Sequence, residues 1–115
     1  MPGHLGLSTS EADFHRKLRH LKLPRADWPE FLKPPSHANT HFFERKGSVC
    51  AIVCYQPDKT KSLSQVAALL THEAVHVWLS AMKEMGEKIP SEEFMAYGIQ
   101  NITQTLLGAL WGKKK

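Results

Sequence analysis

Residues 62–85, with the sequence SLSQVAALLTHEAVHVWLSAMKEM, contain the longest regular pattern in the chain. Apolar residues recur there every three or four positions, which is the period of an amphipathic α-helix. The pattern follows Ser62 and stops before Gly86, a residue type that commonly ends a helix. The expected core stripe of this helix consists of Leu63, Val66, Ala67, Leu70, Ala74, Val77, Ala81 and Met85.

A second helix is predicted from Ser91 to about Trp111. Pro90 interrupts the chain before it, and a serine at position 91 is suited to capping the helix N-terminus. The expected core stripe of this helix consists of Met95, Ile99, Ile102, Leu106 and Leu110. The two predicted helices follow one another after a short loop, so we expect them to pack together.

The first half of the chain changes its pattern. Ser10 can cap a helix with apolar positions at i, i+4 and i+7 that ends before Pro24. Four prolines make residues 24–40 mostly irregular, with Trp28 and Phe31 as anchors to the core. Residues 41–46 and 48–56 have the composition of two strands, and the glycine between them favours an antiparallel hairpin.

The order helix, hairpin, helix, helix predicts an α+β fold. A length of 115 residues fits one domain over residues 1–115, with 1–9 as a loose leader and 112–115 also flexible. No apolar run approaches the ~20 residues that span a bilayer. The start of the chain has neither the charged nor the apolar region of a signal peptide. We therefore expect a cytoplasmic protein without a membrane segment.

Two further features of the composition bear on function. The net charge is +4, but without Lys113, Lys114 and Lys115 only 12 basic residues face 11 acidic ones. Most of the excess is thus a short tail, and such a tail is usually solvated. Cys50 and Cys54 lie about 13 Å apart on one face of the second strand. A disulfide needs Cα atoms within roughly 7 Å, so we expect two buried thiols in a reducing compartment.

The motif that points to chemistry is His72-Glu73-Ala74-Val75-His76, an H-E-x-x-H sequence on a predicted helix. Residues four apart share a helix face, so both imidazoles can reach one ion. Zinc takes such neutral imidazole ligands and leaves a position for water in catalytic sites. Glu73 follows His72 directly, one position further around the helix, and can take a proton from that water as general base. The sequence predicts a zinc site with His72 and His76 as ligands and Glu73 as a catalytic residue.

A third protein ligand is expected from the last helix. Glu93, Tyr97 and Gln100 form one polar strip opposite the core stripe, and we predict Glu93 as the ligand. Glu92 is more simply an exposed acid favoured by the helix dipole, and the same effect would also account for Glu93. Tyr97 either orients a ligand or stabilises an oxyanion, or it is an ordinary half-buried tyrosine.

The remaining histidines are weaker candidates. His15 and His20 lie in the basic N-terminal helix, where we expect them to be exposed, and His4 and His37 lie in segments expected to be irregular. His41, at the start of the hairpin, is the rival third ligand.

With these residues the chain resembles the zincin metallopeptidases, and among them the gluzincins. His72-Glu73-Ala74-Val75-His76 matches their metal helix, and Glu93-Phe94-Met95-Ala96-Tyr97 is similar to their E-x-x-A-Y signature. The resemblance covers about residues 45–105 and extends to minimal phage- or prophage-encoded proteins and to IrrE-like zinc peptidases. It implies His72, His76 and Glu93 as zinc ligands and Glu73 as general base, acting on peptide or protein substrates.

The chain departs from the gluzincin pattern beyond Glu93. Trp111 lies only 18 positions after Glu93, and no histidine or arginine occurs between them. An oxyanion stabiliser must then come from Tyr97, from Tyr55 or His41, or from a partner chain.

Three hypotheses follow from these patterns. The leading one is a zinc-dependent peptidase that binds its substrate along an exposed strand edge, at residues 41–46 or 48–56. The second is a catalytically weak or inactive zincin-like protein that holds zinc as a structural or interaction module. The third, nucleic-acid binding, is not expected, because a solvated helix face explains the basic cluster of Arg16, Lys17, Arg19, Lys22 and Arg25.

Overall fold

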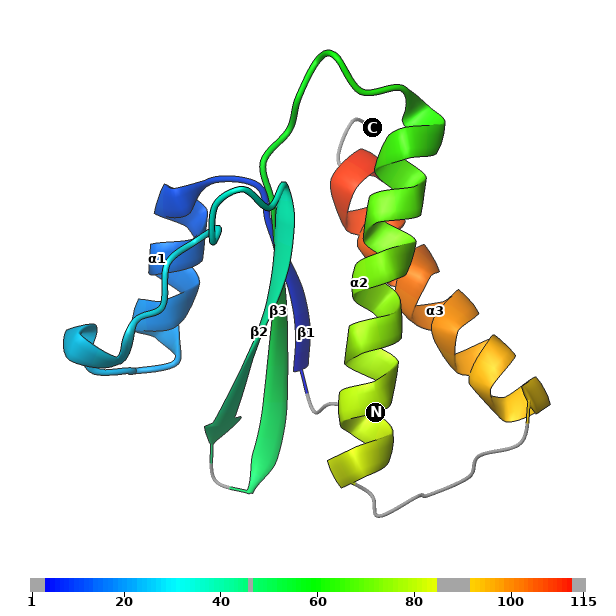
Figure 1. Cartoon of the computed structure of the whole chain (residues 1–115). Helices are drawn as coiled ribbons and strands as arrows, with labels where there is room; N and C mark the ends of the chain where they lie inside the picture. The colour runs from blue at the N-terminus through cyan, green and yellow to red at the C-terminus, as the bar shows by residue number, and fades with distance from the viewer. Residues whose placement is uncertain (1–3, 46, 85–91, 113–115) are drawn as a thin grey trace. The chain divides into compact units, whose positions relative to one another are not determined.

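The computed structural model describes residues 4–45, 47–84 and 92–112 of the chain. Within these residues it contains three α-helices and a three-stranded mixed sheet, so the predicted α+β class is confirmed (Figure 1). The chain divides into two compact units, here called the sheet unit (residues 3–58) and the helical unit (residues 59–115).

The sheet unit is built around a central strand. β3 (Ser48–Tyr55) pairs antiparallel with β2 (Ala38–Arg45) on one side and parallel with β1 (His4–Ser8) on the other. The predicted hairpin is confirmed, with Gly47 in its turn at a φ of +80°, a conformation that glycine adopts without steric cost. Because β3 is central, the expectation that residues 48–56 offer an exposed strand edge is wrong, and the edges belong to β1 and β2.

The N-terminal strand β1 corrects a second expectation. Residues 4–8 are not part of a loose leader, since they pair in register with residues 50–54 of β3. His4 therefore lies on a strand rather than in an irregular segment. The strand is only five residues long, and its partner lies far along the chain, as parallel pairing requires a long crossover connection. Local composition carries no sign of such a pairing. Residues 1–3 and 113–115 lie outside the described residues.

One face of β3 packs against α1 (Glu11–His20). Phe14 and Leu18 of the helix join Phe31 and alternate residues of β3 in one buried cluster. Ser10 caps α1 as predicted, its side-chain oxygen accepting a hydrogen bond from the Asp13 backbone N–H at 3.1 Å. The anchoring of the proline-rich segment is also confirmed, because Phe31 is buried in this cluster and Trp28 packs against it.

The two cysteines are free thiols, as expected. Cys50 and Cys54 are both buried on the α1 side of β3. Burial raises the pKa of the Cys50 thiol above its ordinary value. A thiol with a raised pKa stays protonated and unreactive, so Cys50 serves as a small apolar residue of the core, and the buried Cys54 belongs to the same cluster.

The predicted irregular segment and the first predicted strand are shifted slightly. A short 3₁₀ helix, η1 (Arg25–Asp27), interrupts the segment, and β2 begins at Ala38 rather than at residue 41. The additional strand residues Ala38, Asn39 and Thr40 pair with Tyr55, Cys54 and Val53. Strand boundaries in this region depend on the length of the β3 partner, which local sequence does not specify.

The helical unit consists of α2 (Leu63–Glu84) and α3 (Glu92–Trp111), which lie side by side (Figure 1). At the start of α2, the Ser62 hydroxyl accepts a hydrogen bond from the backbone N–H of Gln65 at 3.2 Å. In return, the side-chain oxygen of Gln65 accepts a hydrogen bond from the backbone N–H of Ser62 at 2.7 Å. This reciprocal pair is a capping box. The predicted helix ends at Met85 and Gly86 and the cap at Ser91 lie outside the described residues.

The two helices approach closely where Trp78 meets Gly98. A Cβ atom added at Gly98 would lie 2.0 Å from a ring carbon of Trp78, so only glycine fits there. Phe94 adds an edge-on contact with the same indole, with ring centroids 5.1 Å apart. The close approach requires a residue without a side chain, and this fixes which face of α3 is turned inward.

The core stripes differ from prediction as a result. On α3 the buried residues are Gly98, Ile102 and Leu106, whereas the predicted Met95, Ile99 and Leu110 are only half-buried. The stripe is rotated because it is centred on a glycine, which apolar periodicity does not count. On α2 the stripe is correct from Val66 to Ala81 apart from half-buried Ala67, but Leu63 is 72% exposed at the first position of the helix.

No helix in the described residues has the length and apolar character needed to cross a membrane.

Candidate metal centre

The two motif histidines lie side by side on α2. Their Nε2 atoms are 3.3 Å apart, and the rings meet edge-on with centroids 4.9 Å apart. Both side chains are exposed. Three or four residues make one helical turn, so the spacing of four brings His72 and His76 to the same face as predicted.

The distance between the two nitrogens suits a shared metal ion. Two nitrogens held at about 2.0–2.1 Å by a tetrahedral zinc ion lie about 3.3 Å from each other. Without a metal, the same distance corresponds to a hydrogen bond in which one ring N–H donates to the other ring. The donor set therefore fits zinc, because neutral imidazole nitrogens are ligands that zinc prefers.

Glu73 differs sharply from its two neighbours in the motif. Its side chain is only 5% exposed, and Leu70, Ala74 and Val77 on the same side of α2 are fully buried. The motif therefore lies across the boundary between the exposed and the buried face of the helix. The two imidazoles point to solvent, whereas the carboxylate belongs to the buried side.

The predicted residues of α3 share an exposed face. Glu93 and Gln100 are exposed, and Tyr97 is 60% exposed, so the predicted polar strip lies on the surface of α3. The alternative that Tyr97 is an ordinary half-buried tyrosine is therefore wrong. Glu92 is exposed as well. In the described part of the chain, however, no three His, Cys, Asp or Glu side chains come together closely enough to hold a metal ion. Glu93 as third ligand and Tyr97 as catalytic residue thus stay predictions.

His41, the rival ligand, has a structural environment of its own. Its ring stacks on Phe14 with centroids 5.1 Å apart, and its Nε2 lies 3.3 Å from the Phe31 carbonyl oxygen. His15 is only half-buried rather than exposed, because its ring contacts Trp28 at 4.9 Å. His20 is exposed as expected. Packing within the sheet unit accounts for His15 and His41.

The basic cluster on α1 is also engaged within its own unit. Arg16 and Lys17 both form ion pairs with Asp13, and Lys17 also donates to the Leu7 carbonyl oxygen at 3.1 Å. Burial acts to raise the pKa of Asp13, but hydrogen bonds from Lys17 and Ser8 and the nearby positive charges outweigh it and leave the pKa lowered. Part of the positive charge of this helix is therefore balanced by a carboxylate.

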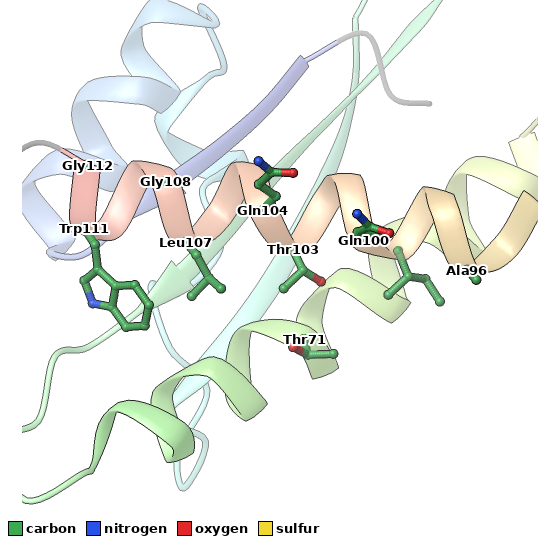
Figure 2. Close-up of a pocket in the computed structure, with 10 residues that line it drawn as sticks. Thr71, Ala96, Gln100, Thr103, Gln104, Leu107, Gly108, Trp111 and Gly112 are labelled. Atoms are coloured by element: carbon green, nitrogen blue, oxygen red, sulfur yellow. The ribbon is translucent and has the colours of Figure 1, made fainter.

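The sequence reasoning missed two features of the helical unit. One is the contact of Trp78 with Gly98, whose only sequence signal is a glycine inside a helical pattern. The other is a groove of about 820 Å³ along α3, to which Thr71 of α2 also contributes (Figure 2).

Comparisons of the chain with family models, with curated proteins and with solved structures find no match.

Proposed function

We propose that this protein is a zinc-dependent metallopeptidase acting on peptide or protein substrates in the cytoplasm. The observation that carries the proposal is the exposed pair of imidazoles, with Nε2 atoms 3.3 Å apart on one helix face. The H-E-x-x-H motif and the gluzincin resemblance of residues 45–105 support it from the sequence side.

In this proposal each residue has a defined task. His72 and His76 bind the metal through their Nε2 atoms, and Glu93 is the third ligand. When bound, zinc would lower the pKa of a coordinated water towards 7 and polarise the scissile carbonyl. Glu73 accepts the proton of the attacking water on its carboxylate and passes it to the leaving amine. Tyr97 donates a hydrogen bond to the developing oxyanion.

The metal site is tested by binding rather than by activity. Cobalt or zinc titration, followed by visible absorption for cobalt and by metal content for zinc, measures affinity in single variants. His72→Ala and His76→Ala are expected to weaken binding roughly 100-fold or more, since even the loss of an outer partner costs 10–100-fold. His20→Ala, an exposed histidine on another helix, is the matched control and should bind as the unmodified protein does.

The third ligand is tested in the same titration. Glu93→Ala should lower the metal affinity, whereas Glu92→Ala should leave it nearly unchanged. If both variants bind metal as the unmodified protein does, the assignment of Glu93 is wrong, and the two histidines alone carry the affinity.

Catalysis is tested with the zinc-loaded protein on casein and on a peptide mixture. Glu73→Gln is expected to reduce hydrolysis by about 10²–10⁴-fold, the usual contribution of general acid–base catalysis. Metal content is measured in parallel, because Glu73 is not a ligand in this scheme. Hydrolysis that survives Glu73→Gln with metal bound would sink the assigned mechanism.

A second candidate function is a catalytically weak or inactive zincin-like zinc-binding protein that acts as an interaction or structural module. The burial of Glu73 favours it, because a general base must reach water held beside exposed histidines. In that case Glu73 contributes to the fold. Glu73→Gln would then lower the unfolding temperature without changing any hydrolysis, whereas a catalytic Glu73 changes the rate first.

A further inference from the structure

The sheet unit contains a small cavity between α1 and β1, with a volume of about 250 Å³. It is lined by His4, Arg16, Lys17, His20, Leu21 and Ile52. Four of these six side chains carry N–H donors, and none of the described lining residues is acidic. A cavity of this composition suits an anion, because a negative charge in it meets only donors and apolar groups.

Four of the lining residues come from one face of α1. Positions 16 and 20, and positions 17 and 21, are each four apart, so the helix brings them to two adjacent rows on the same side. Residues 11–25 contain five basic residues and only two acidic ones. The negative end of the helix dipole accounts for basic residues in the last turn of α1. It does not account for a histidine that approaches them from another element.

That histidine is His4, which β1 holds on the α1 side of the sheet. His4 is opposite Cys50, and Gly6 is opposite Ile52. Cys50 and Ile52 are buried in the cluster that α1 forms with β3. Residues opposite one another on paired strands share a face of the sheet, so His4 also faces α1. The pairing of β1 with β3 therefore brings this imidazole to the basic residues of the helix.

The Lys17 side chain is held in a defined position beside β1. A Cβ atom added at Gly6 would lie 3.5 Å from Lys17 Cε, so the lysine stem lies against the bare glycine. A glycine within a strand often marks such a close approach. The Lys17 ammonium donates to the Leu7 carbonyl oxygen at 3.1 Å and pairs with Asp13. These contacts use two of its three N–H donors, and the third can serve a ligand.

Asp13 orders the two cations of the cavity without cancelling both charges. Its carboxylate, which is not part of the cavity lining, pairs with Arg16 and with Lys17. One negative charge beside two positive ones leaves an excess of positive charge. The Arg16 guanidinium has five N–H donors, so its pairing with one carboxylate oxygen leaves others for a ligand. Both cations are thus positioned before a ligand binds, which reduces the entropic cost of binding.

We propose that this cavity binds a phosphate group, either as free phosphate or as part of a small phosphate ester. The donors approach from a helix and from a strand, and a tetrahedral phosphate accepts charge-assisted hydrogen bonds from several directions at once. A carboxylate has only two oxygens in one plane and would use fewer of these donors. The volume is below the roughly 300–1,000 Å³ of pockets for drug-sized ligands, so the ligand must be small.

The site is tested by calorimetric titration of the full chain with inorganic phosphate, without added metal. We expect saturable binding in the millimolar range or tighter. Arg16→Gln should weaken it by about tenfold or more, because a charged donor is lost. Arg19→Gln is the matched control, since it removes the same charge from an exposed position of the same helix outside the cavity. Absence of saturable binding, or equal weakening by both variants, overturns the proposal.

The contribution of β1 is tested in the same titration, with circular dichroism to confirm that the variants fold. His4→Ala removes one neutral donor and should weaken phosphate binding by about two- to tenfold. His37→Ala, at an exposed histidine outside the cavity, should leave the binding unchanged. If His4→Ala also binds phosphate as the unmodified protein does, a site built from both elements is excluded.

The class of anion is tested with acetate and with phenyl phosphate. Acetate should bind at least about tenfold more weakly than inorganic phosphate, because it reaches fewer of the charged donors. Acetate binding of equal strength would reveal a site for any small anion and contradict the assignment to phosphate. Phenyl phosphate separates the two sources of the phosphate group. Tighter binding than that of inorganic phosphate supports an ester that also packs on Leu21 and Ile52, and weaker binding supports free phosphate.

Discussion

Histidines have opposite environments in the sheet unit and in the helical unit. In the sheet unit, His41 is half-buried, stacks on Phe14 and lies 3.3 Å from a backbone carbonyl oxygen. In the helical unit, His72 and His76 are exposed and contact each other. Packing explains the first histidine but leaves the pair without a structural reason. The difference teaches that the environment, more than the count of histidines, identifies the functional candidates.

The largest effect is expected in the core of the sheet unit. Phe14 is fully buried and contacts both Phe31 and His41. Phe14→Ala should lower the free energy of unfolding by about 3–5 kcal/mol, measured by chemical denaturation. Phe42, which is 40% exposed, provides the control, and Phe42→Ala should cost clearly less. Equal losses would show that α1 does not anchor this unit.

The helical unit is tested next, at its closest approach. Gly98→Ala places a methyl group against the Trp78 ring and should destabilise the protein by about 1–3 kcal/mol. Gly108→Ala meets nothing within 4 Å and should add up to about 1 kcal/mol through helix propensity. Thermal unfolding of the two variants checks the signs. A stabilising Gly98→Ala would mean that the helices pack differently.

A smaller effect is expected at the start of α2. Ser62→Ala removes one half of the capping box and should cost about 1 kcal/mol. Ser36→Ala, an exposed serine of the sheet unit, serves as the control. If hydrogen exchange in the first turn of α2 is unaffected by Ser62→Ala, the cap does not hold this helix end.

The smallest effect concerns acid stability of the sheet unit. The pKa of Asp13 is lowered in the folded protein. At pH values above its ordinary pKa of 3.8, the ion pairs of Asp13 therefore stabilise the fold, and this stabilisation is lost as the pH falls through the lowered pKa. Asp13→Asn should therefore be less stable than the unmodified protein near neutral pH, and the difference should vanish in strong acid. A difference that grows in acid would reverse the assigned direction.

The sequence was sufficient where structure is local. The helix carrying His72 and His76, the cap at Ser10 and the hairpin around Gly47 all follow from periodicity and turn residues within a short window. The side-by-side placement of the two imidazoles follows from a spacing of four, which a helix converts directly into proximity.

Features that depend on distant residues could not be predicted in the same way. The inward face of α3 is set by the fit of Trp78 onto Gly98, a contact between residues 20 positions apart. Burial of Glu73 depends on which face of α2 is covered by other residues, and the H-E-x-x-H motif alone does not show this. The third ligand is a question of the same kind, since it requires α3 to bring Glu93 to the histidines of α2.

The pairing of β1 with β3 also sets an order of events during synthesis. His4 is opposite Cys50, so this strand leaves the ribosome 46 residues before its partner. At about 5–20 residues per second, β1 waits roughly 2–9 s before β3 has been made. The β2–β3 hairpin closes a much shorter loop and forms faster. We therefore expect β1, although it is made before β2 and β3, to join the sheet last and to dock as an edge onto the β2–β3 hairpin.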